Sequence, residues 1–417
     1  TELLFPNNLL KPGNVLERMV NDIPTEDWED AVQIIGWMYQ YYNVELKDDT
    51  FAKLKKNIKI SKERIPAATQ LFTPDWIVRY MVENSLGRIY IDKRRNEGVY
   101  ADGRGLDEMT WHEAESERIK AEKEIAEKMG WKYYLPEAEQ EPEVREQLNK
   151  ISAEASENFD ITKIKVLDPC MGSGHILVYA FDVLMQMYVE FGYSEREAAK
   201  SIVENNLYGL DIDNRAGQLA YFAVMMKARK YNRRILNVET KPNVMAIQES
   251  NSINPDYLSL FGDLESKARE LLDNMKDAKD LGSIIRVKLT VEELTELKNK
   301  AEEIKNSVYD NFFDKARQAG ITAEFIPLIE QAIILAQKYE VVVTNPPYMG
   351  ASGMNDRLAK YVKKNFPDSK SDLFAAFIEK CHQMTRENGY QAMITQHAWM
   401  FLSSYEKLRE KMLHINI

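Results

Sequence analysis

Cysteine is scarce in this sequence, which has only Cys170 and Cys381 among its 417 residues. Two cysteines cannot build a disulfide framework or a four-thiolate zinc site, so we expect a reducing, cytoplasmic setting. The five histidines stand without Cys or acidic partners at ligand spacing, which predicts no metal site. Because no apolar run approaches the roughly 18 residues of a membrane span and no signal-peptide pattern opens the chain, we expect no membrane contact.

Positive charge is also in deficit, since 55 Lys and Arg face 66 Asp and Glu, for a net charge of -11. Affinity for nucleic-acid phosphates comes largely from Lys and Arg, which argues against the whole surface gripping a nucleic acid. Two local groups of basic residues could still bind nucleic-acid phosphates. The first is Lys53, Lys55, Lys56, Lys59, Lys62 and Arg64, and the second is Lys360, Lys363, Lys364 and Lys370. The alternative interpretation of each group is the solvated face of a helix or loop.

The first 90 residues have the pattern of a helical region. Large apolar side chains recur there at spacings of three and four, which puts them on one helix face; they are Trp28, Val32, Ile35, Tyr39 and Tyr42. A second helix is expected to start at Thr73-Pro74, with Thr73 as its N-cap, and to run to about Leu86. Residues 91–160 are charged and poor in apolar side chains, with a helical pattern at 113–128, so we expect a surface insertion or linker.

From residue 161 the pattern changes to short apolar runs that alternate with helical stretches. The expected strands are 164–167, 207–210, 243–247, 341–343 and 392–394. Strand–helix alternation predicts an α/β domain over 161–417, with a parallel sheet covered by helices on both faces. The charged segment at about 252–335 is too long for a simple connection and is expected to be a helical insertion.

The first candidate site is the turn that follows the first expected strand. There Asp168 and Pro169 precede a Gly-x-Gly formed by Gly172 and Gly174, and a helix is expected from Ile176. Glycines let a ligand lie against the main chain, and a helix start offers free N–H groups to an anion. A Gly-x-Gly alone is weak evidence, but its place between a strand and a long helix favours a cofactor loop.

An acid ends the next expected strand, at Asp211, followed by Ile212 and Asp213. A carboxylate at this strand tip would bind ribose hydroxyls with both oxygens, as in nucleoside-cofactor sites. In nicotinamide-binding proteins this acid follows the glycines by about 20 residues, and Asp211 lies much further on, which disfavours a dinucleotide. The alternative interpretation is that Asp211 or Asp213 only caps the following helix.

The third motif is Asn345-Pro346-Pro347-Tyr348, directly after an apolar strand. The two prolines fix a rigid, extended turn whose carbonyl groups can point into a pocket. An amino group on an aromatic ring is a poor nucleophile, and the Asn345 amide oxygen and the Pro346 carbonyl can accept its two hydrogens and favour a tetrahedral nitrogen. Tyr348 offers a face on which a base can stack.

These three motifs resemble the cofactor loop, ribose-binding acid and catalytic motif of class I amino-methyltransferases. The preceding stretch, Gln70 to Pro74, resembles the motif that comes before the cofactor loop in γ-ordered DNA adenine-N6 methyltransferases. Together with 36–42 and Asp372 to Phe377, the pattern is most similar to the PglX-type methyltransferases of BREX phage-defence systems. The resemblance implies a Rossmann-like fold, S-adenosylmethionine as cofactor, and transfer of a methyl group to N6 of a flipped-out adenine in double-stranded DNA.

The same resemblance implies cofactor contacts from Phe72, Thr73, Pro74, Asp168, Pro169, Gly172, Gly174, Asp211, Ile212 and Asn345. In this family an acid after the third strand binds the adenine ring of the cofactor; Gln248 and Glu249 are the candidates here, and Asp263 is a more distant one. The target-recognition domain expected after the catalytic domain has no counterpart in these residues. We therefore expect a separate segment or subunit to supply most of the affinity for DNA, and we expect other defence-system subunits as partners.

Two other functions compete with DNA adenine methylation. One is methylation of RNA or of a protein glutamine, because such enzymes also carry Asn-Pro-Pro-Tyr; the Thr73-Pro74 motif and the large insertions favour DNA. The other is a cofactor-binding scaffold that is active only with partners, which the acidic surface would suit. His175 and His397 are expected to pack or line the site and not to act as bases.

Overall fold

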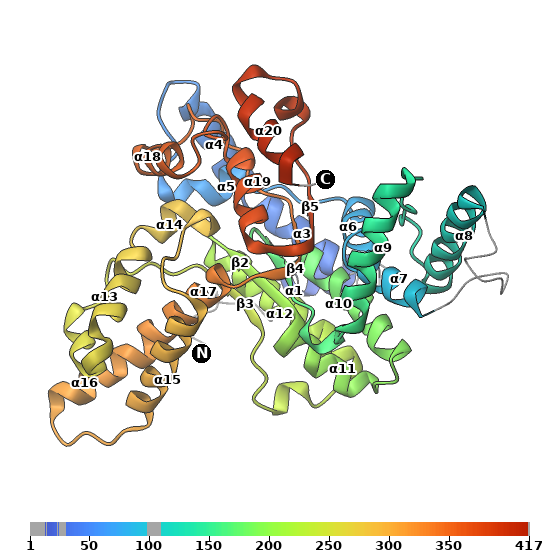
Figure 1. The fold of residues 1–417 in the computed structure, drawn as a ribbon. Helices are drawn as coiled ribbons and strands as arrows, with labels where there is room; N and C mark the ends of the chain where they lie inside the picture. Colours follow the sequence, from blue (N-terminus) through green and yellow to red (C-terminus); the bar gives the residue numbers. More distant parts are fainter. Residues whose placement is uncertain (1–12, 14, 23, 25–30, 98–109, 416–417) are drawn as a thin grey trace.

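The computed structural model describes residues 13, 15–22, 24, 31–97 and 110–415 of the chain (Figure 1). Five parallel strands form one sheet in the order β3-β2-β1-β4-β5. They are β1 (Val166–Asp168), β2 (Leu207–Asp211), β3 (Asn243–Ala246), β4 (Tyr339–Thr344) and β5 (Thr385–Met393). All five expected strands are present, and the α/β fold class is confirmed.

The fifth strand starts well before the expected run at 392–394. Its first part, Arg386 to Asn388, is exposed and polar, so it carries no apolar signature. The pairing with β4 shifts register between Tyr339 and Val341, and Asn388 takes a positive φ of 58° in this irregular part. A bulged, solvated strand end of this kind is invisible to a search for apolar runs.

Successive residues of the buried strands face two different cores, as the two-residue repeat of a strand requires. Leu167, Tyr208 and Val342 belong to one hydrophobic cluster. Their neighbours Val166 and Val341 belong to another. The sheet is therefore the middle layer of three, with helices on both faces.

One face is covered by helices from the first half of the chain. They are α6 (Asp75–Glu83), α7 (Leu86–Asn96), α10 (His175–Glu190), α11 (Glu195–Ser201) and α12 (Asn214–Tyr231). The N-terminal part before them holds α1 (Val15–Asp22), α3 (Ala31–Tyr42), α4 (Val44–Leu54) and α5 (Ile65–Thr69), and α3 packs on α10 and α12. Short helical turns join these elements at η2 (Lys62–Arg64), η4 (Ile161–Lys163), η5 (Ile202–Asn206) and η6 (Ile235–Asn237).

Two expectations for the N-terminal helices need revision. Trp28 and the side chains of Val32 and Ile35 lie outside the described residues, and of the remaining pair Tyr39 is buried while Tyr42 is 70% exposed. The helix expected from Thr73 begins one residue later, with Pro74 as N-cap and no side-chain cap bond. Thr73 is not a cap because its hydroxyl is used elsewhere, as described below.

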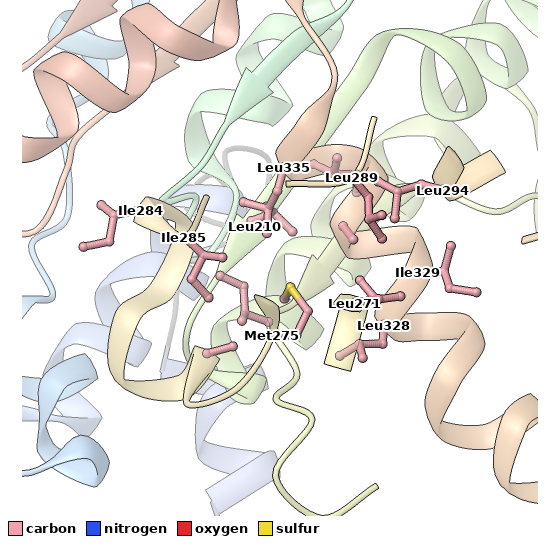
Figure 2. Packing of buried hydrophobic residues seen from close by; sticks show 14 of the residues in the cluster. Leu210, Leu271, Met275, Ile284, Ile285, Leu289, Leu294, Leu328, Ile329 and Leu335 are labelled. Atoms are coloured by element: carbon pink, nitrogen blue, oxygen red, sulfur yellow. The ribbon is translucent and has the colours of Figure 1, made fainter. Parts of the chain in front are cut away.

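The other face is covered by the segment between β3 and β4, which is helical. It comprises η7 (Pro255–Leu264), α13 (Glu265–Asn274), α14 (Ala278–Leu281), η8 (Gly282–Ile284), α15 (Val291–Asn306), α16 (Phe312–Gly320), η9 (Ile321–Phe325) and α17 (Ile326–Ala336). Figure 2 shows Leu271, Met275 and Leu328 of this segment packed with Leu210 of β2. The segment thus forms a single core with the sheet.

The stretch Phe312–Ala336 is a helix long and apolar enough to cross a membrane by length and composition, with a mean hydropathy of 1.5 over its best window. The sequence-based expectation that no such run exists is therefore wrong. Of that window, 56% is buried inside the protein, and Leu328 and Ile329 are core residues beside the sheet. Core helices of globular proteins have this composition as well.

Two long helices, α8 (Trp111–Met129) and α9 (Pro142–Glu157), pack against α7. The Glu122 carboxylate is fully buried and accepts hydrogen bonds from Arg88, Arg95 and Arg118 at 2.8, 3.1 and 2.6 Å. Tyr134 donates to the same carboxylate at 2.9 Å. Charged residues that make the sequence of this segment look solvated therefore form part of its interior.

The chain after β4 adds α18 (Asp356–Asn365), α19 (Leu373–Met384), η10 (His397–Met400), η11 (Ser403–Tyr405) and α20 (Glu406–Ile415). The direction in which strands are added to the sheet reverses after β3, because β2 and β3 lie on one side of β1, whereas β4 and β5 lie on the other. Open α/β sheets bind ligands beyond the carboxyl ends of the strands at such a switch point. The site is therefore expected beside the ends of β1 and β4.

Candidate active site

The glycine turn connects β1 to α10, and its two glycines have different surroundings. Gly172 and Gly174 have φ of 53° and 88°, in the left-handed region that favours glycine. A Cβ on Gly172 would meet no heavy atom within 4 Å, whereas one on Gly174 would lie 3.0 Å from Ala220. Gly172 therefore leaves open space for a ligand, and Gly174 lets the turn pack closely on α12.

Asp168 lies at the end of β1, directly at the switch point. Its Oδ1 accepts hydrogen bonds from the Thr344 hydroxyl at 2.7 Å and the Cys170 N–H at 3.0 Å, which ties β1 to β4. Its Oδ2 is buried and has no hydrogen-bond partner among the described residues. Burial raises the pKa of Asp168 to about 7. A buried oxygen without a donor is costly, so it marks a place where a ligand's donor group fits.

Asp211 at the end of β2 reaches back to the glycine turn. Its two oxygens accept the N–H groups of Gly172 at 2.9 Å and Asp213 at 2.8 Å. Burial raises its pKa to about 6. Asp213 is the residue that caps α12, through the Arg215 N–H at 2.9 Å, and it also accepts the Tyr39 hydroxyl at 2.5 Å. The helix-cap interpretation thus holds for Asp213 and fails for Asp211.

The Asn345–Tyr348 turn begins where β4 ends, at Thr344. The Asn345 amide nitrogen donates to the Thr73 hydroxyl at 3.1 Å. The Tyr348 hydroxyl lies 3.0 Å from the Asn345 Oδ1 and 2.9 Å from the carbonyl oxygen of Ile394, which follows β5. Burial raises the pKa of Tyr348 to about 12, so the phenol keeps its proton and can donate. Both polar atoms of the Asn345 amide are therefore oriented by side chains.

The connection from α5 to α6 includes Phe72, Thr73 and Pro74, and it contacts the Asn345 turn through Thr73. The Phe72 ring stacks in parallel on His175, with ring centroids 4.9 Å apart. A Cβ on Gly36 would come within 2.1 Å of the Phe72 ring, so α3 can approach this ring only because residue 36 is glycine. His175 is buried in this stack, in agreement with the expectation that it packs.

A cavity opens among these motifs. The expected site residues that line it are Pro169, Gly172, Asp211, Ile212, Asn345 and Pro347. The expected residues that do not line it are Phe72, Thr73, Pro74, Asp168, Gly174, Pro346, Tyr348, Gln248 and Glu249. Asp168, Thr73 and Tyr348 nevertheless bond directly to the loop residues beside the cavity or to Asn345 itself.

Gln248 and Glu249, the candidates for the adenine ring of a cofactor, lie outside the cavity wall. The Gln248 side chain is held by the Ala246 carbonyl at 2.9 Å and the Asn214 side chain at 3.3 Å. Glu249 forms an ion pair with Lys62 at 2.6 Å. Asp263 does not line the cavity either. The side chains of Gln248 and Glu249 therefore already have hydrogen-bond or ion-pair partners, and they lie outside the space that a ligand would fill.

The helical insertion supplies a wall of the cavity that the sequence did not reveal. Asp280, Leu281, Gly282 and Ser283 line it. The Ser283 hydroxyl donates to the Pro169 carbonyl, which fastens the insertion to the glycine turn. Asp280 accepts from the Asn355 amide at 2.8 Å. The signal available in the sequence was an acid followed by glycine in an otherwise helical stretch, and such pairs are common.

Other residues that line the cavity were not predicted as site residues from the sequence. Ile65, Pro66 and Thr69 from α5, Tyr39 from α3, and Leu373 and Phe377 from α19 line the cavity. The two α19 residues contribute apolar surface to the cavity, which suits a flat ring. In the described part of the chain, no group of three His, Cys, Asp or Glu side chains is placed to hold a metal ion.

Comparisons with known proteins identify relatives of this chain. The chain is 41% identical to the adenine-specific methyltransferase BrxX of Escherichia coli O9:H4 (strain HS) over 433 residues, which cover 98% of this chain and 32% of that protein. It is 43% identical to the adenine-specific methyltransferase PglX of Lacticaseibacillus casei (strain Zhang) over 408 residues, 96% of this chain and 31% of that protein. The chain thus spans about a third of the length of these curated relatives. Residues 205–416 match the family model described as Eco57I restriction-modification methylase, and the chain therefore belongs to the Eco57I restriction-modification methylase family.

Proposed function

We propose that this chain is the catalytic part of a DNA methyltransferase that uses S-adenosylmethionine to methylate adenine at N6. The observation that carries the proposal is that Asn345 and Pro347 line the same cavity as Gly172 and Asp211. A nucleoside-type pocket and an amine-binding turn thus meet at the switch point of the sheet. The two relatives named above are adenine-specific methyltransferases, which supports adenine as the target.

The residues present fit S-adenosylmethionine. The Asp168 Oδ2 lacks a donor, and an ammonium group in the methionine part of the ligand would satisfy it. Asp211 has further lone pairs for ribose hydroxyls, and Gly172 leaves space beside it. Leu373 and Phe377 offer an apolar surface for the adenine ring of the cofactor, and Asp280 is an acceptor for the amino group of that ring. When bound, S-adenosylmethionine supplies an electrophilic methyl group on a sulfonium.

The Asn345 turn is proposed to prepare the target nitrogen. Its amide oxygen and the Pro346 carbonyl accept the two hydrogens of the adenine amino group, which favours a tetrahedral, nucleophilic nitrogen. The Thr73 hydroxyl holds the Asn345 amide in the orientation that presents the oxygen. Once a base is bound, the Tyr348 hydroxyl can keep its bond to the Ile394 carbonyl while the ring stacks on that base.

The partners follow from the same proposal. The substrate is double-stranded DNA with one adenine rotated out of the stack, because the exocyclic nitrogen is inaccessible inside a duplex. A phage-defence or restriction-modification role, other defence-system subunits and a cytoplasmic location are the setting in which such a methyltransferase would work.

The proposal is tested by separating chemistry from cofactor binding in the full-length protein that contains this chain. Asn345→Ala should slow single-turnover methylation of plasmid DNA by at least ~100-fold, the usual scale for one well-placed transition-state hydrogen bond. For Asn345→Ala, calorimetry should show little change in the affinity for S-adenosylmethionine. Asp211→Ala, in contrast, should weaken that affinity. Near-normal methylation by Asn345→Ala would refute the proposed chemistry, and an equal loss of cofactor binding would move Asn345 into the cofactor site.

A further inference from the structure

The two basic groups of the sequence lie next to each other although they are far apart along the chain. The Ile60 N–H, beyond the end of α4, donates to the Gly353 carbonyl before α18 at 3.1 Å. The Lys59 ammonium forms an ion pair with Asp356 in the first turn of α18 at 2.7 Å. Figure 1 shows α4 and α18 as neighbours on one side of the molecule.

The lysines of these two segments differ in how they are paired. Lys53, Lys59 and Lys62 form ion pairs with Asp49, Asp356 and Glu249. Six others are exposed and have no ion-pair or hydrogen-bond partner for their ammonium groups among the described residues: Lys55, Lys56, Lys360, Lys363, Lys364 and Lys370. We call these six residues the lysine ridge.

Unpaired lysines gathered in one place are unexpected on a chain with net charge -11. On α18 the apolar residues Leu358 and Val362 are buried, so Lys360, Lys363 and Lys364 line the solvent side of the helix. Residues 45–64 hold seven Lys or Arg against four Asp or Glu, and residues 356–372 hold five against three, so the two segments together carry a net charge of +5. The ridge therefore lies in a region of net positive charge on an acidic chain.

The segments that carry the ridge continue into elements that form the cavity wall. The chain leaving α4 continues into α5, whose Ile65 and Pro66 line the cavity. On the other side Asn355, which caps α18, donates to the cavity residue Asp280. A duplex that delivers a base to this cavity must run its backbone past one side of the cavity, and the segments that carry the ridge lead up to one such side.

We infer that the lysine ridge binds the phosphate backbone of duplex DNA beside the flipped base, independently of sequence. The inference rests on the proposed function for its substrate and adds the surface that holds it. Lysines act on phosphates as point charges, so they position the duplex without reading bases. An acidic protein or another segment of the same protein is the competing occupant.

The test compares two full-length variants, each with three positive charges removed. Lys360→Gln/Lys363→Gln/Lys364→Gln removes the α18 part of the ridge. Lys123→Gln/Lys230→Gln/Lys315→Gln removes three exposed lysines on α8, α12 and α16, away from the cavity. Affinity for a mixed-sequence duplex is measured over a range of salt concentrations, together with plasmid methylation and S-adenosylmethionine affinity.

The ridge variant should bind the duplex about tenfold or more weakly at about 0.1 M salt, and its salt slope should fall by about one for each phosphate that a lysine no longer neutralises. Its KM for DNA should rise while its single-turnover rate at saturating DNA and its cofactor affinity stay unchanged. The matched variant should behave like the parent.

Equal weakening in both variants, or unchanged DNA affinity in the ridge variant, would overturn the inference, the latter in favour of a protein occupant. Failure of the parent to methylate would refute the proposed function instead, and the duplex measurement would still decide the ridge.

Discussion

At the scale of single residues, the hydroxyl of Tyr348 has a role that stacking alone does not require. If only the ring mattered, Tyr348→Phe would be tolerated. In the structure the hydroxyl lies 3.0 Å from the Asn345 Oδ1 and 2.9 Å from the Ile394 carbonyl, so it positions both the asparagine and its own ring. The same oxygen of Asn345 is the proposed acceptor for the target amine.

We therefore expect Tyr348→Phe to lower the single-turnover methylation rate by about tenfold, the equivalent of one hydrogen bond. Tyr348→Ala should lower it further because the stacking surface is removed too. Cofactor affinity should not change in either variant. Single-turnover methylation assays measure the rate, and calorimetry measures the cofactor affinity. A Phe variant as fast as the parent would show that stacking is the whole contribution.

The buried Asp168 gives the protein a specific pH dependence. Its pKa is raised to about 7 by burial, so folding favours the protonated form. The corresponding stability is fully present below the ordinary pKa of about 4 and is lost as the pH rises to about 7, by up to ~1.4 kcal/mol per pH unit.

Asp168→Asn should remove this loss, because the amide keeps an oxygen for Thr344 and Cys170 and never ionises. The unliganded variant should gain stability relative to the parent as the pH rises from about 5 to about 8, as followed by thermal unfolding without ligand. It should also bind S-adenosylmethionine more weakly at the upper end of this range, since the carboxylate is gone. Parallel pH profiles for parent and variant would contradict this account of Asp168.

At the scale of elements, the packing of α7, α8 and α9 depends on a buried cluster of charges. Glu122 of α8 is 0% exposed and forms ion pairs with Arg88, Arg95 and Arg118. Arg145 of α9 joins the cluster through Glu115 of α8, which also pairs with Arg118. Removing one partner of a buried ion pair leaves uncompensated charge, which costs roughly 3–5 kcal/mol. The cluster thus decides whether these helices hold together.

Glu122→Gln should accordingly lower the free energy of unfolding by about 3 kcal/mol or more, measured by denaturant titration. The matched control is Glu146→Gln on α9, where the ion pair with Lys150 is exposed, and little change is expected there. Equal small effects in the two variants would mean that apolar contacts alone hold the three helices.

At the scale of the whole molecule, the charge distribution indicates that this chain holds the DNA backbone and that sequence recognition lies elsewhere. The chain carries a net charge of -11, and the lysine ridge is a local exception to that acidic character. Such a surface can hold a backbone but offers little for reading base edges.

The 417-residue chain by itself should therefore bind duplex DNA weakly, without sequence preference and with a steep salt dependence. Binding of matched duplexes of different sequence at several salt concentrations measures all three properties. Nanomolar, sequence-specific binding by this chain alone would overturn the expectation that target recognition resides elsewhere.

Several features followed from the sequence alone because they depend on local chemistry. An apolar strand ending in Asp168 and two glycines can form only a few backbone turns, and Asn345-Pro346-Pro347 fixes its own geometry wherever it occurs. The alternation of strands and helices after residue 161 predicted the three-layer architecture, because consecutive parallel strands need helical crossovers.

Other features were decided only by the tertiary structure, because they join residues that are distant in the chain. The cavity wall at Asp280 depends on how the helical insertion folds back on the sheet, and nothing local distinguishes Asp280 from Glu249. The lysine ridge exists because the chain after α4 pairs with the loop before α18 through Ile60 and Gly353, and Glu122 is buried where three arginines surround it. Burial and proximity are properties of the packed molecule, so residue type and spacing along the chain cannot specify them.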